Sequence, residues 1–158
     1  MPPSTLPRRS WLGAMAAATA GVASAATPAP RSAPADNGPP HKIVYQLNHH
    51  EPEYQEAVLN SIGAVLKKYV DDVAIAVVAW GPGIHLLAKA PQRPVAPVHQ
   101  QRIRGMSEAY GVTFIACGNT MHSLGWDASS MLDFVRIEEV GAAALMELQE
   151  KGYAYIAW

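Results

Sequence analysis

The sequence contains a single cysteine, Cys117, among its 158 residues. One thiol cannot form a disulfide within the chain, so the protein is not a small secreted domain held together by cystines. Basic residues are also scarce: 12 Lys and Arg stand against 13 Asp and Glu, for a formal net charge of −1. They form no basic stripe, which argues against a nucleic-acid partner.

A long apolar run is also lacking. The N-terminal run, 13–22, is short and rich in Ala and Gly, which argues against a permanent membrane span. The pair Arg8-Arg9 precedes it, and Ala23-Ser24-Ala25 supplies the small residues of a signal-peptidase site. We interpret residues 1–26 as a twin-arginine signal peptide, which predicts export to the periplasm. An ordinary secretory signal that carries two arginines is the alternative.

The segment after this signal differs in composition. Residues 27–41 hold five prolines and no apolar periodicity, which is typical of an extended linker. Residues 42–158 have the usual size of one domain. With 49% apolar and 16% charged residues, the chain is able to form a packed core.

Apolar runs of strand length alternate with helical patterns in the domain. The predicted strands are 42–47, 73–79, 112–116, 134–140 and 153–157, the predicted helices are 52–69, 84–88, 98–110 and 141–151, and 118–133 is a predicted loop with a helical turn at 127–132. This alternation indicates βαβ units and a mostly parallel sheet of about five strands. Right-handed crossovers then give an α/β three-layer sandwich of flavodoxin-like type.

Polar and reactive residues follow the ends of the predicted strands. Ligands of open parallel sheets bind outside the carboxyl ends of the strands. The segments that leave those ends here are 48–50, 80–83, 117–122 and 138–139. The turn Gly81-Pro82-Gly83 has neither the spacing of a dinucleotide-binding motif nor the lysine of a P-loop, which argues against nucleotide binding.

Cys117 is the most reactive residue at this end of the sheet. The backbone N–H groups of Gly118, Asn119 and Thr120 are suited to favour its thiolate. A thiolate there is able to carry sulfur as a persulfide, attack a disulfide or bind a soft metal. The alternative is a buried cysteine that only packs at the end of a hydrophobic strand.

Three neighbouring residues suggest a metal site. Cys117, Met121 and His122 carry ligand types that copper or zinc accept, although their spacing fits no recognised metal motif. Two further residues have two interpretations each. His49 is either part of the site or a solvated loop residue, and Trp80 either lines a pocket or covers the core.

Segments 77–87, 111–121 and 152–156 resemble the DsrE/DsrF-like family, and in particular its small, single-domain, exported branch. The most specific part is Phe-x-x-Cys-x-Asn-Thr, which begins at Phe114. The resemblance implies a flavodoxin-like fold, dimers, trimers or hexamers, and a cysteine that carries persulfide sulfur between partner proteins. That role falls on Cys117, with Asn119 and Thr120 in the supporting loop.

The leading hypothesis is therefore a periplasmic sulfur carrier or sulfur-handling accessory protein with a persulfide on Cys117 and no other firm cofactor. Its partners are sulfur donor and acceptor proteins or small sulfur species. A turnover enzyme is less favoured, because no acid/base pair lies beside the thiol in sequence. The alternatives are a copper or zinc module and a non-catalytic oligomeric interaction protein. The supporting site residues are Gly118, Asn119, Thr120, Trp80, Gly81, Gly83 and His49.

Overall fold

The structure is a computed structural model that describes residues 38–158. The predicted signal peptide, 1–26, and the linker up to residue 37 lie outside the described residues. The linker prediction extends one residue too far, because His41 already belongs to the first strand. None of the described helices is both long enough and apolar enough to cross a membrane.

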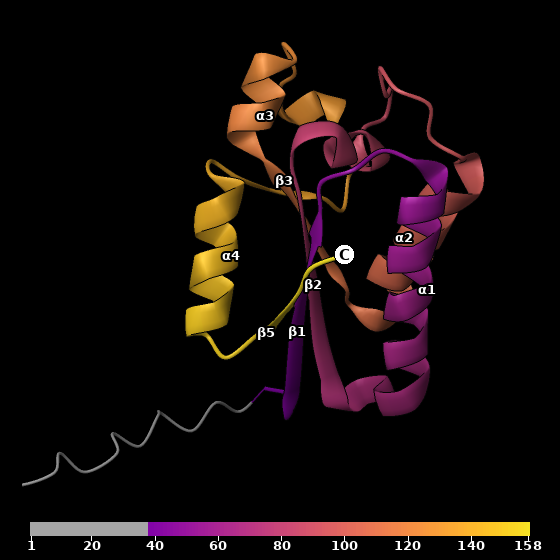
Figure 1. Ribbon diagram of the computed structural model, residues 1–158, viewed down its shortest axis with the longest axis vertical. Helices are drawn as coiled ribbons and strands as arrows, with labels where there is room; N and C mark the ends of the chain where they lie inside the picture. The colour runs from indigo at the N-terminus through magenta and orange to yellow at the C-terminus, as the bar shows by residue number, and fades with distance from the viewer. Residues whose placement is uncertain (1–37) are drawn as a thin grey trace, which may run out of the picture. The chain divides into compact units, whose positions relative to one another are not determined.

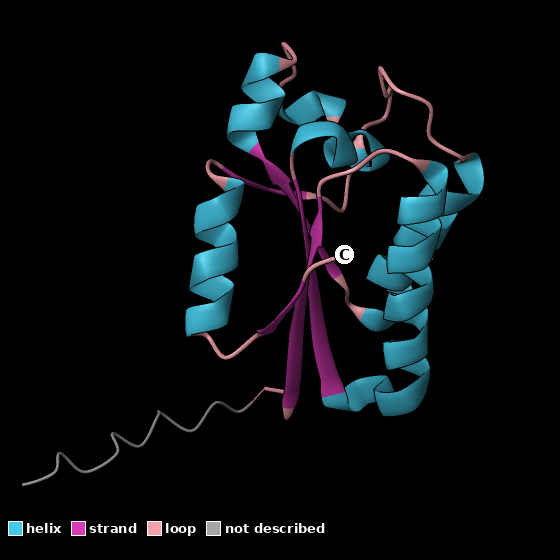
Figure 2. Cartoon of the chain, viewed as in Figure 1, coloured by secondary structure: helices cyan, strands magenta, loops and turns pink. Residues whose placement is uncertain are grey.

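Five strands and four α-helices alternate along the described chain (Figure 2), and the strands and all of these helices except α3 lie close to where the sequence predicts them. The strands are β1 (His41–Leu47), β2 (Val73–Ala79), β3 (Thr113–Cys117), β4 (Arg136–Glu138) and β5 (Ala154–Ile156). The α-helices are α1 (Pro52–Tyr69), α2 (Pro97–Tyr110), α3 (Gly118–Ser123) and α4 (Gly141–Glu150). Three 3₁₀ helices join them: η1 (Val70–Asp72), η2 (Gly81–Leu87) and η3 (Ala128–Ser130).

All strand pairs in the sheet are parallel, and the strand order is β4-β3-β2-β1-β5. Each strand from β1 to β4 lies beside the one before it, so the sheet grows in one direction. The chain then crosses back, and β5 pairs with the free edge of β1. Right-handed crossovers place helices on opposite faces when the direction of stepping reverses. Accordingly α1 and α2 cover one face and α4 covers the other, which gives the predicted three layers (Figure 1).

The sheet is buried on both faces, which explains the unbroken apolar sequence of β2. Side chains alternate between the faces along each strand. Val77 packs in the core beneath α1 and α2, whereas Val78 packs with Leu145 of α4. Local signals fix the helix ends as expected: Pro52 begins α1, and Gly111 ends α2 at φ +65°.

The structure corrects three details of the predicted elements. The segment predicted as a loop begins with α3, because burial of Met121 in the core stabilises a helix that Gly118 and Asn119 disfavour. The fourth strand is shorter than 134–140, since Phe134 and Val135 turn into the core before β4 begins. The predicted short helix at 84–88 is the 3₁₀ helix η2, and it begins earlier, at Gly81.

Candidate functional site

Cys117 lies at the carboxyl end of the sheet, where β2, β3 and β4 all end. It is the last residue of β3 and the N-cap of α3. Cys117 pairs in register with Glu138 of β4. Because side chains alternate along β3, Cys117 shares the α4 face with Ile115.

The thiol is enclosed by Trp80 and by the start of α4. Cys117 is 6% exposed, and its Sγ accepts a hydrogen bond from the backbone N–H of Gly141 at 3.2 Å. The carbonyl oxygen of Glu139 lies 3.9 Å from Sγ and accepts from the protonated thiol. A Cβ on Gly141 would lie 3.0 Å from Cys117 Cβ and 3.1 Å from Trp80 Cε3, so glycine permits this close approach.

The surroundings of the thiol favour its ionised form. Burial raises the pKa of Cys117, but the backbone N–H groups of Gly141, Thr120 and Asn119 and the Thr120 hydroxyl outweigh it. The pKa of the thiol is therefore held below its usual value of 9.0. Hydrogen bonds to the charged form are the physical cause.

Thr120 also joins the thiol loop to the Gly81-Pro82-Gly83 turn. Its Oγ1 accepts a hydrogen bond from the Gly81 N–H at 3.2 Å. Gly81 has φ +51°, a conformation that L side chains rarely adopt. A Cβ on Gly83 would lie 2.3 Å from the Leu47 carbonyl oxygen, so η2 packs directly on the end of β1.

Gly118 and Asn119 hold the segment after β4 against α3. The Asn119 N–H donates to the Glu139 carbonyl oxygen at 2.9 Å. A Cβ on Gly118 would lie 3.1 Å from Glu139 Cα. Gly118 therefore supports the thiol indirectly, by positioning the backbone that leads into Gly141, and Asn119 does so in addition to the effect of its N–H on the thiol pKa.

The remaining predicted residues are not brought together with the thiol. Met121 is buried in the core on the α1 and α2 face, and His122 is exposed. His49 is exposed, stacks near Tyr54 with 5.0 Å between ring centroids, and lies 3.6 Å from Glu51. Within residues 38–158, no group of three or more His, Cys, Asp or Glu side chains has a geometry suited to a metal ion.

Sequence reasoning missed Gly141, the closest donor to the thiol. It lies 24 residues after Cys117, so local spacing does not relate the two. Its position in the sequence is the feature that could have indicated this role. Gly141 directly follows the fourth predicted strand, and so lies at the same end of the sheet as the cysteine. Close approach of backbone to a neighbour is a common reason for such a glycine.

The fold and the site together define a small α/β protein with an all-parallel sheet and a buried free thiol at a strand end. The chain belongs to the DsrE/DsrF-like family, whose model matches residues 41–158. That family is associated with sulfur relay. A search of curated proteins finds no match.

Solved structures show the same fold. The protein of unknown function MTH1491 from Methanobacterium thermoautotrophicum is 24% identical with a TM-score of 0.63, over 75% of this chain and 99% of that one. The ychN protein from E. coli is 14% identical with a TM-score of 0.62, over 75% of this chain and 99% of that one. BT1422 from Bacteroides thetaiotaomicron, also of unknown function, is 20% identical with a TM-score of 0.51, over 74% and 94%.

Proposed function

We propose that the protein is an exported sulfur carrier in which Cys117 holds sulfur as a persulfide. The observation that carries this proposal is the hydrogen bond from the Gly141 N–H to Cys117 Sγ, together with the N–H groups at the start of α3. These donors lower the pKa of the thiol, and the thiolate is the form that attacks sulfur. Membership of a family associated with sulfur relay supports the same role.

The transfer step needs only the thiolate and a sulfane-sulfur donor. Cys117–S⁻ attacks the outer sulfur of a donor R–S–SH, a new S–S bond forms at Cys117, and the donor S–S bond breaks. The immediate products are Cys117–S–SH and the leaving thiolate R–S⁻. The proton of the new persulfide then passes to R–S⁻, which gives Cys117–S–S⁻ and R–SH, and no external oxidant is required. Attack by an acceptor thiolate on the outer sulfur reverses these events and completes the relay.

Mass spectrometry of the intact protein tests this proposal. After incubation with polysulfide and removal of excess reagent, we expect an adduct of about 32 Da, the mass of one sulfur atom, on a nucleophilic thiolate. Cys117→Ser should carry no adduct. An unmodified wild-type protein, or an equal adduct on Cys117→Ser, contradicts the carrier role.

Burial of Cys117 favours one competing function, a non-catalytic interaction protein in which the cysteine only packs. In that case a thiol reagent modifies the unfolded chain but not the native one. The copper or zinc alternative, centred on Cys117 and His122, has less support because His122 is exposed and Met121 packs in the core. Metal stoichiometry that is the same in Cys117→Ala and wild type excludes a metal site on the thiol.

We also propose that the protein self-associates through β4 and α4. β4 is an edge strand whose three residues are all exposed, and such edges are usually covered or paired. Large apolar side chains lie exposed nearby, at Ile137, Val140 and Met146. Sedimentation analysis should show an oligomer for wild type and a smaller species for Ile137→Asp. A wild-type monomer contradicts this proposal.

Export through the twin-arginine route is a separate part of the proposal, and it is carried by the sequence of residues 1–26. Substitution of both arginines by lysine, Arg8→Lys with Arg9→Lys, should leave the precursor in the cytoplasm. Fractionation of the producing cells measures the result. Normal export of the double variant would contradict the twin-arginine route while leaving an ordinary secretory signal open.

A further inference from the structure

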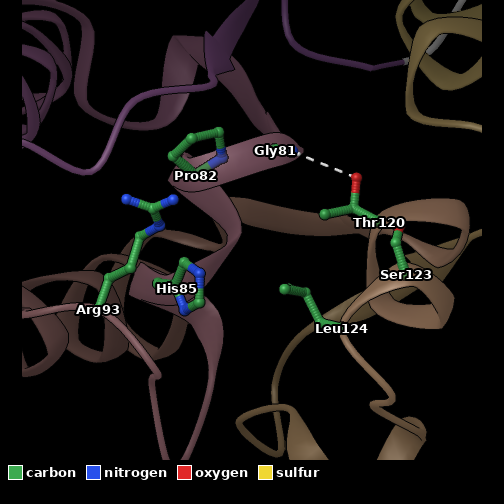
Figure 3. Close-up of a pocket in the computed structure, with 7 residues that line it drawn as sticks. All are labelled: Gly81, Pro82, His85, Arg93, Thr120, Ser123 and Leu124. Carbon is green, nitrogen blue, oxygen red and sulfur yellow. Dashed lines mark hydrogen bonds between the residues drawn. The ribbon is translucent and has the colours of Figure 1, made fainter.

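A cleft of about 240 Å³ opens beside Thr120, between η2 and α3 (Figure 3). Its volume is several times the roughly 30 Å³ that one water molecule occupies in the liquid. Pro82 and His85 contribute from η2, Arg93 from the loop after η2, and Ser123 from α3. None of the lining side chains is acidic. The polar groups of the cleft are one positive charge, on Arg93, together with an imidazole and two hydroxyl groups.

His85 brings a buried donor to this cleft. It is 2% exposed, and its Nδ1 accepts a hydrogen bond from the Gln92 N–H at 3.2 Å. Burial, followed by the charges of Arg93 and His50, lowers the pKa of His85, so the neutral ring prevails. With Nδ1 acting as an acceptor, the ring proton resides on Nε2. Within the described part of the chain, no hydrogen bond engages this Nε2–H.

Arg93 supplies the positive charge. In Figure 3 Arg93 and His85 lie on the same side of the cleft, opposite Thr120 and Ser123. The Arg93 side chain is exposed, and it forms no ion pair with any residue between 38 and 158. An arginine without an ion-pair partner in the described chain, together with an imidazole N–H that makes no hydrogen bond there, is suited to receive an anion from solution.

The hydroxyl groups of the cleft are already engaged. Ser123 Oγ donates to the Asn119 carbonyl oxygen at 2.7 Å. Thr120 Oγ1 accepts from Gly81, and its hydroxyl contributes to the lowered pKa of Cys117. The free donors are therefore the guanidinium and the imidazole N–H. Both donors belong to residues that line one cleft, and two donors are suited to two oxygens of one oxyanion, while Pro82 offers an apolar surface to the rest of a ligand.

We propose that this cleft binds a small oxyanion, with its oxygens held by the Arg93 guanidinium and the His85 Nε2–H. The oxyanion is either a sulfur oxyanion or the carboxylate of a small sulfur-bearing molecule. The choice of a sulfur-bearing ligand rests on the proposed role of Cys117, whereas the anion site itself does not. Thr120 borders the cleft, and its hydroxyl also lowers the pKa of the Cys117 thiol. A sulfur donor bound in the cleft would therefore be separated from the thiol by Thr120.

Titration followed by NMR tests the site directly. The His85 ring resonances are recorded in the purified full-length chain while thiosulfate, sulfate or acetate is added to about 10 mM at constant ionic strength. Trp126 provides a second signal, because its ring lies 5.0 Å from that of His85 in an edge-to-face contact. We expect saturable changes at both rings. Arg93→Gln should weaken binding by at least about tenfold.

Lys67→Gln is the control for loss of one positive charge. Lys67 is an exposed residue of α1 that neither lines the cleft nor belongs to the proposed β4 and α4 interface, so its loss should leave the affinity unchanged. Binding of thiosulfate and sulfate but not acetate identifies a sulfur-oxyanion site, and binding of acetate alone identifies a carboxylate site. Absence of saturation with all three anions overturns the proposal, as does equal affinity in Arg93→Gln and wild type.

Cys117→Ser separates this inference from the proposed function. The variant should bind the anion as wild type does, because Cys117 does not line the cleft. Anion binding without persulfide formation on wild type would refute the carrier role and leave the anion site standing. Persulfide formation without anion binding would refute the anion site and leave the carrier role standing.

Discussion

On one face of the sheet, α1, α2 and η2 cover a large apolar core that includes Leu59, Ile62 and Phe114. On the other face, α4 alone covers a small cluster formed by β1, β2 and β3, and Cys117 lies on this face beside Trp80. The first face provides most of the hydrophobic stabilisation, which grows with the apolar area removed from water. The face that α4 covers alone holds the free thiol, and backbone N–H groups beside it lower the pKa of Cys117.

The same substitution should affect the two faces very differently. In Gly83→Ala the new Cβ would lie 2.3 Å from the Leu47 carbonyl oxygen, a backbone atom that is fixed in the sheet. We expect a loss of more than about 3 kcal/mol in the free energy of unfolding. In Gly141→Ala the nearest atoms belong to the side chains of Cys117 and Trp80, at 3.0 and 3.1 Å. These are able to shift, so we expect a loss of about 1–2 kcal/mol.

Urea denaturation followed by circular dichroism measures both losses. Gly63→Ala is the control, because no atom lies within 4 Å of a Cβ at this position in α1. It should stabilise the protein by up to about 1 kcal/mol. If Gly83→Ala unfolds at the same urea concentration as wild type, the packing of η2 on β1 is not as described.

A pair of leucines compares the two cores more evenly. Leu59 of α1 is 1% exposed in the large core, and Leu145 of α4 is 7% exposed in the small cluster. We expect Leu59→Ala to cost about 3–4 kcal/mol and Leu145→Ala about 2 kcal/mol, because a thin layer relaxes more readily around a cavity. Thermal and urea unfolding measure both values. Equal losses would remove the distinction between the faces.

A smaller effect, on the pKa of Cys117, is expected from substitution of Thr120, which contacts both the thiol and the turn at Gly81. Thr120→Val removes the hydroxyl that helps to lower the pKa of Cys117, so the pKa should rise. The rate of thiol alkylation as a function of pH reports this shift. Thr120→Ser keeps the hydroxyl and should titrate close to wild type. A midpoint that is the same in all three proteins would show that the hydroxyl does not act on the thiol.

The lowered pKa also predicts a weak dependence of stability on pH. In the folded protein the pKa of Cys117 lies below 9.0, whereas in the unfolded chain it lies near 9.0. Folding stability therefore rises with pH between these two pKa values. The contribution is complete above 9.0 and is lost as pH falls through the folded-state pKa. The difference in melting temperature between wild type and Cys117→Ser, measured across this range, should grow with pH. A constant difference contradicts the prediction.

The fold was largely predictable because periodicity and local signals agree with it. The apolar run of β2 and the helical spacing of α1 each define one element, and Pro52 and Gly111 mark helix ends. α3 is not predicted because local propensity disfavours it, and tertiary contacts such as the burial of Met121 stabilise it. β4 was placed correctly but drawn too long, since an exposed edge strand carries little apolar pattern.

The candidate site was predictable in location but not in detail. Strand ends that meet at one end of a parallel sheet direct attention to Cys117, Thr120 and Trp80 without any structure. Gly141 and the pair His85 and Arg93 come from distant segments, so their roles depend on tertiary packing that the sequence does not display. His122 shows the converse: it lies one residue from Met121 in the sequence, yet its side chain is exposed while that of Met121 packs in the core.

Titration of the native Cys117 thiol with an alkylating reagent tests the central claim most directly. The account predicts that the folded, processed protein reacts at this residue, with a midpoint below the usual thiol pKa of 9.0. A native protein that remains unmodified, and reacts only after unfolding, would contradict an activated carrier thiol. It would instead show that Cys117 packs at the end of β3 and carries no sulfur.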